Sequence, residues 1–314
     1  MKLNHISLSC LLMGVLVFAP TRTQAQTLLD PSRTAQDTSQ SLSNDGESVV
    51  GGSTAAEESS GDSDLGIQML LKRNENAQPF SLWVDSSGFW TDNAANVSTG
   101  ETQDYFYAGG VNTAWRYKLE GRYYADAYLG QHWYRYDSMR QLDYDNGEVS
   151  FGLLAALPEL KDSIFYLHHY YQRITQDITD SSIYDAQQIR VGLQNAIQIN
   201  AANSVNIGLT SSYGIGTSPE LLQRHEHALQ LGYKFRVSSQ VVLSLSYRLA
   251  YFDYFNMQER QDVNQNLGAA VTYRPCVNFE MGAGYYYAIN QSNNAFFDYQ
   301  TQLGGISVAG KLKF

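Results

Sequence analysis

Charged side chains of both signs recur on the same side of an alternating pattern of apolar and small polar residues. Seven of them are candidates to line one wall: Arg122, Asp126, Arg190, Glu226, Lys234, Arg248 and Glu280. If that wall encloses water, opposed charges set a field across it, and the basic excess on this face favours anionic solutes. The same charges can instead pair and brace the wall. We therefore predict pore-lining positions and leave these two roles open.

Histidines are the other candidates for chemistry, and the chain has six: His5, His132, His168, His169, His225 and His227. Ester or peptide hydrolysis needs a serine beside a histidine and a third group that orients the ring. No local spacing in the sequence provides that set. His225 and His227 share one face of a predicted strand and could hold a divalent ion, but no third ligand is evident. We therefore predict no catalytic residue, no metal site and no cofactor.

The composition limits the class of protein. The 314 residues carry a net charge of −10, only 17 % are charged, and 13 % are aromatic. Soluble domains usually have about 25 % charged residues, so this chain is poor in charge. The acidic balance argues against a nucleic-acid partner, and the 23 Tyr and 25 Gly favour strands over helices. After the first 25 residues, no stretch is apolar enough to predict a membrane helix.

The N-terminal segment is typical of a targeting sequence followed by a linker. Lys2 precedes an apolar run at 6–19, and a small-residue cleavage motif follows, which predicts a signal peptide over 1–25. Residues 26–77 are rich in Ser, Asp, Glu and Gly and are predicted to be a disordered periplasmic leader. Within this leader, 64–72 has enough apolar residues for a short helix, and a linker without structure fits the same residues.

From residue 78 onward, apolar residues recur at every second position. Val241, Leu243, Leu245 and Tyr247 fall on one face, and the residues between them are mostly small or polar, which is typical of a half-buried strand. Twelve such segments are predicted: 79–91, 102–117, 119–136, 147–158, 161–173, 184–199, 202–214, 224–236, 239–252, 262–274, 276–289 and 300–314. Short and long connections alternate between them, as in membrane barrels with tight turns at one end and longer loops at the other.

Strands with one continuous apolar face can cross a membrane only as a closed barrel, because an open edge would leave backbone groups without partners. We therefore predict an all-β fold, a transmembrane up-and-down antiparallel β-barrel of about twelve strands over 78–314. A soluble sandwich would instead turn its apolar faces inward. Aromatic residues near the segment ends, such as Trp83, Tyr213, Tyr251 and Tyr273, favour the membrane. An even number of strands puts both termini on the periplasmic side.

The C-terminus ends on alternating apolar residues and a final aromatic ring: Ile306, Val308, Leu312 and Phe314. This ending resembles the C-terminal β-signal of bacterial outer-membrane proteins, which the barrel-assembly machinery reads at a free strand edge. The last third of the chain resembles the β-barrel porin families of Gram-negative bacteria. That resemblance is carried by 264–275, the Gly-Tyr-Tyr-Tyr of 284–287, the Asn-rich 290–294, 297–299 and 310–314.

The resemblance to porins implies an outer-membrane channel for passive diffusion of small solutes, and the basic face adds an expected preference for anions. The implied partners are outer-membrane lipid, the barrel-assembly machinery, and small solutes or saccharides, and no nucleic acid is expected. Some similar families are outer-membrane components of exopolysaccharide export systems, so a role in such export is a second possible function. A barrel hydrolase, or a structural anchor without channel activity, would also fit a membrane barrel of this size.

Overall fold

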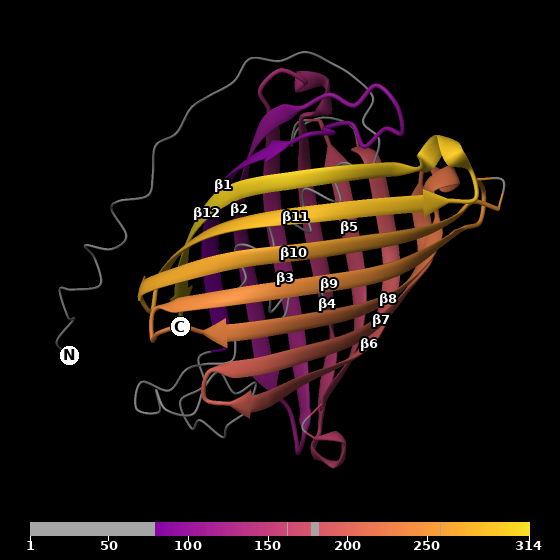
Figure 1. Ribbon diagram of the computed structural model, residues 1–314. Coiled ribbons are helices and arrows are strands. Elements are labelled where there is room, and N and C mark those ends of the chain that lie inside the picture. The colour runs from indigo at the N-terminus through magenta and orange to yellow at the C-terminus, as the bar shows by residue number, and fades with distance from the viewer. Residues whose placement is uncertain (1–78, 162, 177–181, 258) are drawn as a thin grey trace.

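The computed structural model describes residues 79–161, 163–176, 182–257 and 259–314, which form twelve strands (Figure 1). The strands are β1 (Phe80–Thr91), β2 (Asp104–Lys118), β3 (Tyr123–Tyr136), β4 (Tyr144–Leu157), β5 (Ser163–Thr175), β6 (Ser182–Asn200), β7 (Asn203–Ser218), β8 (Arg224–Arg236), β9 (Val241–Tyr254), β10 (Gln261–Cys276), β11 (Phe279–Ser292) and β12 (Tyr299–Lys313). Short 3-10 helices lie in four connections: η1 (Arg140–Leu142), η2 (Pro158–Leu160), η3 (Glu220–Leu222) and η4 (Ala295–Phe297). No helix among the described residues is long and apolar enough to cross a membrane. The predicted signal peptide (1–25), leader (26–77) and short helix (64–72) lie outside the described residues.

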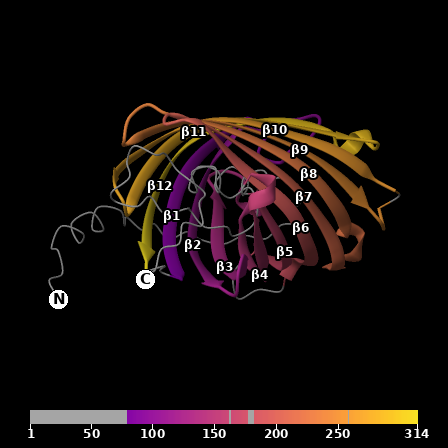
Figure 2. The same ribbon diagram turned by 90° about the horizontal axis from the view of Figure 1, so that it is seen from below.

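Each strand pairs with the next one along the chain, and β1 pairs with β12, so the sheet closes into a barrel (Figure 2). The closing pair begins at Ser81 opposite Lys313 and continues to Thr91 at the end of β1. All twelve pairings are antiparallel. The predicted all-β antiparallel barrel of twelve strands is confirmed. Closure leaves none of these strands with a free edge.

The predicted strand segments match the observed strands closely, and segment 224–236 has the same bounds as β8. The larger shifts occur beside the long connections, where β4 begins at Tyr144 rather than 147 and β7 continues to Ser218 rather than 214. The strands extend into polar sequence there because the hydrogen bonds between strands join backbone groups and do not depend on the type of side chain. The long loops are correspondingly shorter than the side-chain pattern predicts.

The connections differ between the two ends of the barrel. One end, here called the short-turn end, carries 119–122, 158–162, 201–202, 237–240 and 277–278 together with the C-terminal Phe314. The opposite end, here called the long-loop end, carries the described residues 92–103, 137–143, 176, 219–223, 255–257, 259–260 and 293–298. In the first of the short turns, Gly121 has a φ of +64°, a conformation that favours glycine. The predicted alternation is present, with 158–162 as the longest of the short turns.

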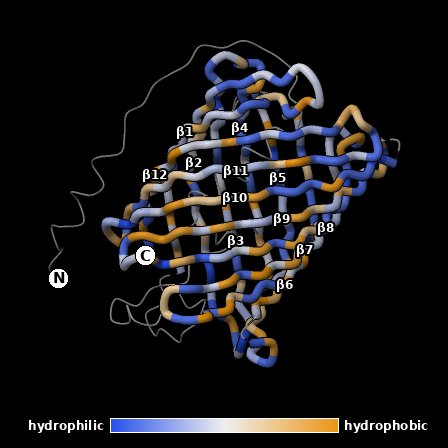
Figure 3. The backbone as a smooth tube through the Cα atoms, in the orientation of Figure 1, coloured by the Kyte–Doolittle hydropathy of each residue, from blue (hydrophilic) through white to orange (hydrophobic). Residues whose placement is uncertain are grey.

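The barrel wall separates two kinds of side chain. Along β9, Leu243, Leu245 and Tyr251 point outward and are exposed, whereas Arg248 and Ala250 point inward and are buried. Hydropathy alternates in the same way along many strands (Figure 3). An apolar outer wall around a polar inner wall is what a hydrocarbon surrounding requires of a barrel. The predicted orientation of the strands, with apolar side chains outside, is therefore present.

Aromatic residues near the strand ends mostly face outward, as predicted. Tyr213 and Tyr251 are exposed on the outer wall near the long-loop end. Trp83 is a correction to this prediction. It is 8 % exposed, faces the interior and packs against Tyr128 with the ring centroids 5.9 Å apart. Because Trp83 is two residues from the inward-facing Asp85, the alternation of the strand places both on the inner wall.

A charge introduced on the outer wall tests this orientation. Leu129 lies at the middle of β3 and is 54 % exposed, and Leu221 in η3 has the same exposure at the long-loop end. We expect Leu129→Arg to lower the free energy of unfolding in lipid vesicles by about 2–4 kcal/mol, because its guanidinium enters hydrocarbon. Guanidinium chloride titration measures the change. Leu221→Arg is the matched control and should change little, and equal losses at both positions would contradict a lipid-facing wall.

Candidate pore wall

Asp126 on β3 is the centre of a buried ionic cluster on the inner wall. Its Oδ1 accepts a hydrogen bond from Nε of Arg116 at 2.9 Å, and its Oδ2 lies 3.6 Å from Nε2 of His168. Gly152 on β4 leaves space for the imidazole, since a Cβ there would lie 2.4 Å from Cδ2 of His168. A guanidinium from the neighbouring strand therefore balances this carboxylate, as a buried charge requires.

A second buried carboxylate, Asp85 on β1, is held by a chain of hydrogen bonds across three strands. Asn112 donates from Nδ2 to Oδ1 of Asp85 at 3.0 Å, and Tyr128 donates its hydroxyl proton to Oδ1 of Asn112 at 2.7 Å. His132 lies on the other side of Gly110 from this carboxylate. A Cβ at Gly110 would lie 2.8 Å from Oδ1 of Asp85 and 2.4 Å from Cδ2 of His132, so only glycine leaves room for both side chains. This part of the inner wall is a connected polar network that fixes its own side chains.

Arg248 of β9 and Glu226 of β8 form a buried ion pair on another part of the inner wall. Nη2 of Arg248 donates to Oε1 of Glu226 at 2.5 Å, and both side chains are less than a tenth exposed. The guanidinium carbon of Arg248 also lies 5.9 Å from the ring centroid of Phe252 on the same strand. The carboxylate offsets the charge of Arg248, so this pair braces two neighbouring strands.

Two other arginines of the inner wall lie over aromatic rings. The guanidinium carbon of Arg190 lies 3.3 Å from the ring centroid of Tyr170, and its Nε donates to Oε1 of Gln188 at 3.2 Å. Arg224 lies over the ring of Tyr254 at 5.2 Å and donates to the hydroxyl oxygen of that residue. The ring of Tyr170 holds the guanidinium of Arg190 in place without neutralising its charge.

Arg260 brings a further cation to the long-loop end. It belongs to the connection 255–260, yet it is buried, and its Nε donates to Oδ1 of Asp262 at 3.0 Å. Its guanidinium carbon lies 3.5 Å from the ring centroid of Phe297 in η4. The loop therefore folds this side chain back between β10 and η4, where it joins two connections of the long-loop end.

The charges of the inner wall are partly segregated by sign. The buried acids at inward-facing positions of β1 to β4 are Asp85, Asp104, Asp126 and Glu148, and Arg116 is the cation that pairs with one of them. The cations at inward-facing positions of β6 to β9 are Arg190, Arg224, Lys234, Arg236 and Arg248, and Glu226 is the acid at such a position. In a closed ring of twelve strands, β2 and β3 stand across from β8 and β9, and Figure 1 shows β3 and β4 behind β9. Walls of opposite sign set an electric field across the space between them.

The predicted pore-lining residues fall into two groups. Asp126, Arg190, Glu226, Lys234, Arg248 and Glu280 lie at inward-facing positions of their strands. Near the short-turn end, Oε2 of Glu280 accepts a hydrogen bond from Nε of Arg274 at 3.1 Å. Arg122 is a correction: it is exposed in the turn 119–122 and pairs with Glu159 at 2.9 Å. Since β3 begins only after Arg122, the strand alternation that predicted an inward direction does not apply to this residue.

Several charged residues of the inner wall were not among the predicted pore-lining positions. Arg224, Glu148 and Asp262 face inward and are buried. The alternation of β8 would have identified Arg224, because it is two residues from Glu226. Arg260 is different, since no strand alternation extends into its loop. Only the packing of the long-loop end places that guanidinium beside Asp262.

The histidines are divided between the two faces of the wall. His168 faces the interior, whereas His169 faces outward and stacks on Phe151 with the ring centroids 5.1 Å apart. His225 and His227 both face outward on β8, in line with their spacing. Within the described ranges, there is no group of three or more His, Cys, Asp or Glu that could hold a metal ion.

Acidic residues near the long-loop end hold the connection 137–143. Asp143 accepts the backbone N–H of Tyr136 at 2.7 Å, and partial burial raises the pKa of its carboxyl above the ordinary value although that hydrogen bond opposes the shift. Asp104 accepts the backbone N–H groups of Ser138 and Met139 at 3.1 and 2.8 Å. These carboxylates therefore tie the loop to β2 and β3.

The four residues predicted as an assembly signal lie at the seam of the barrel. Ile306, Val308, Leu312 and Phe314 occupy outward-facing positions along β12 and its end. Phe314 donates its N–H to the carbonyl oxygen of Phe80 at 3.0 Å and accepts the N–H of Phe80 at 3.2 Å. The last residue of the chain therefore takes part in closing the barrel.

No protein-family model matches this sequence, and no curated protein matches it. Among solved structures, an outer-membrane channel from Pseudomonas putida F1 is similar, with a TM-score of 0.56 and 8 % identity over 82 % of this chain and 100 % of that chain. The NanC porin is also similar, with a TM-score of 0.45 and 10 % identity over 73 % of this chain and 100 % of that chain. The likeness to the Pseudomonas protein shows that the chain has the fold of an outer-membrane β-barrel.

The buried pair of Arg248 and Glu226 gives a test of the inner wall. We expect Glu226→Gln to lower the free energy of unfolding by about 1.5–3 kcal/mol, because a charge-assisted hydrogen bond in a buried site is weakened. Denaturant titration in detergent micelles measures the loss. The double exchange Glu226→Arg with Arg248→Glu should recover much of it. Glu159→Gln, in the exposed pair with Arg122, is the control and should change stability little; a loss as large as that of Glu226→Gln would contradict the assignment.

Proposed function

We propose that the protein is an outer-membrane, porin-like channel for passive diffusion of small solutes. The observation that carries this proposal is an inner wall that bears buried charged side chains of both signs, enclosed by an apolar outer wall. Water inside and hydrocarbon outside suit these two walls. The fold shared with the Pseudomonas outer-membrane channel agrees with that location. Outer-membrane barrels have short periplasmic turns, so the short-turn end and both ends of the barrel domain belong on the periplasmic side.

The proposed channel favours small anions and acidic saccharides over cations. Arg190 supports this preference, because it contacts the ring of Tyr170 and the amide of Gln188, both of which are neutral. An anionic group can therefore approach Arg190 without displacing a carboxylate, whereas the charge of Arg248 is already offset by Glu226. Several cationic positions along one wall bind a passing anion weakly and in succession, which conduction requires.

The C-terminal strand is proposed to be the segment that the barrel-assembly machinery recognises. Before β1 pairs with it, β12 presents a row of free backbone groups, to which another strand can add. Ile306, Val308, Leu312 and Phe314 form the apolar face of that strand toward lipid. The partners of the mature barrel are then outer-membrane lipid on the outside and small solutes on the inside.

Conductance in planar lipid bilayers tests the channel. We expect discrete current steps in KCl. Under a salt gradient, we expect the reversal potential to have the sign of a channel that is more permeable to anions than to cations. Arg190→Glu should lower the ratio of anion to cation permeability about two- to tenfold, the factor that corresponds to roughly 0.4–1.4 kcal/mol. Arg122→Glu makes the same charge change in the exposed turn and is the matched control, with a smaller expected effect.

Absence of current steps from protein that migrates as a folded barrel would contradict the channel. An unchanged reversal potential for Arg190→Glu would contradict anion preference but leave the channel itself standing. Assays for lipase and protease activity on the same sample separate the channel from a barrel hydrolase, and substantial turnover without conductance would favour the hydrolase.

A further inference from the structure

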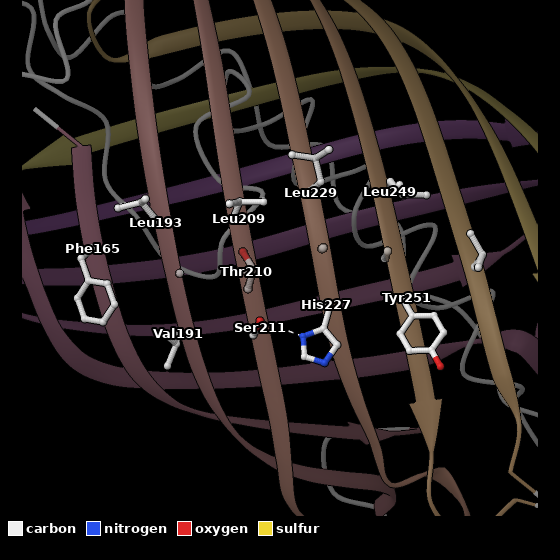
Figure 4. Close-up of a pocket in the computed structure, with 14 residues that line it drawn as sticks. Phe165, Val191, Leu193, Leu209, Thr210, Ser211, His227, Leu229, Leu249 and Tyr251 are labelled. Atoms are coloured by element: carbon white, nitrogen blue, oxygen red, sulfur yellow. Dashed lines mark hydrogen bonds between the residues drawn. The ribbon is translucent and has the colours of Figure 1, made fainter. Parts of the chain in front are cut away.

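The outer wall carries a hollow of about 600 Å³ that extends across β5 to β10 (Figure 4). Most of the side chains that line it are apolar and outward-facing. This hollow is on the opposite face of the wall from the charged residues of the candidate pore. Because the outer wall of a membrane barrel is surrounded by lipid, an acyl chain is the neighbour that such a surface meets.

The strand register arranges the lining residues in rows across the wall. Leu193, Leu209, Leu229 and Leu249 stand directly opposite one another on β6, β7, β8 and β9. Figure 4 shows this row of four leucines along one edge of the hollow. Four aligned branched chains give a continuous apolar contact surface across the strands, which suits a flexible hydrocarbon chain.

The next row toward the long-loop end contains a polar pair. Ser211 stands opposite His227, with Val191 and Tyr251 on either side of them. Oγ of Ser211 lies 2.9 Å from Nδ1 of His227, and Figure 4 shows the hydroxyl and the ring directed at each other. When the hydroxyl donates to Nδ1, Nε2 of His227 carries a proton that can be donated outward. A donor at the edge of hydrocarbon is costly unless an acceptor meets it.

The third row, still closer to the long-loop end, is polar. Tyr213 stands opposite His225, which stands opposite Asp253. Tyrosines on a membrane barrel mark the level of the lipid headgroups. Ser211 and His227 therefore lie between an apolar row and a headgroup row. In a membrane lipid, the ester carbonyls that join the acyl chains to the headgroup occupy that intermediate depth.

We propose that this hollow holds one membrane lipid, with an ester-linked acyl chain along the leucine row and its ester carbonyl hydrogen-bonded to the pair of Ser211 and His227. In the tautomer in which Ser211 donates to Nδ1, the carbonyl accepts the N–H of Nε2 of His227. The site binds the ester without cleaving it, because no carboxylate or amide of the described residues hydrogen-bonds His227 to orient its ring, and the surrounding strand N–H groups pair within the sheet rather than stabilise an oxyanion.

Native mass spectrometry of the detergent-solubilised full-length protein tests this site. The probes are a dipalmitoyl phosphatidylethanolamine and its dialkyl-ether analogue, which lacks the ester carbonyls. We expect the wild-type barrel to retain one ester lipid about three- to tenfold more strongly than the ether lipid, the factor given by one hydrogen bond. The double variant Ser211→Ala with His227→Ala should bind both lipids equally. Leu209→Trp, which fills the hollow, should lower retention of both.

His169→Ala is the matched control, because His169 also faces outward but lies outside the hollow, and it should bind as the wild type does. Equal retention of ester and ether lipids by the wild type would overturn the proposal. A stable oligomer without bound lipid would also overturn it, because a second copy would then cover the hollow. Release of palmitate from the bound ester would overturn it as well, because the site would then cleave the ester. Each variant is first tested for folding by gel electrophoresis, in which a folded barrel migrates differently in unheated and heated samples. Lipid retention is read out independently of current, so failure of the channel proposal does not decide this one.

Discussion

Closure of the hydrogen-bond ladder between β1 and β12 is the constraint on which the rest of the structure depends. In hydrocarbon every backbone N–H and C=O needs a partner within the protein, and a sheet meets that requirement only when it has no edge. Once the ring is closed, each residue of each strand points either to lipid or to the interior. The position of Trp83 on the inner wall and of Ile306 on the outer wall follows from this single condition.

The arginines of the inner wall differ in the groups that they contact. Asp126 with Arg116, and Glu226 with Arg248, are ion pairs in which each buried charge meets its opposite. Arg190 contacts a ring and an amide instead, so it keeps its charge available to a solute. The proposed function therefore gives bracing and selectivity, which the residue types left open, to different arginines of the same wall.

One part of the outer wall has a more specific arrangement of side chains than the rest. Most of the outer wall needs only to be apolar, and many different side chains meet that requirement. The row of four leucines and the adjacent pair of Ser211 and His227 differ, because they place a hydrogen-bonding group at one depth in an otherwise apolar surface. The two residues are on neighbouring strands, sixteen positions apart in the sequence, and strand pairing alone brings them together.

The sequence by itself determined the strands, their number and the face that each residue takes, because side chains alternate strictly along an extended chain. It therefore predicted the inward direction of Asp126, Arg190, Glu226 and Arg248. Arg122 was misplaced because alternation stops in its turn, and Arg260 was missed because its loop folds back. Trp83 and Arg224 lie where alternation holds, and it places both on the inner wall. Only the tertiary structure decided which residues meet, since register joins Ser211 to His227 and barrel closure sets β1–β4 across from β7–β10. Contacts between strands depend on that register, which no local pattern of residues contains.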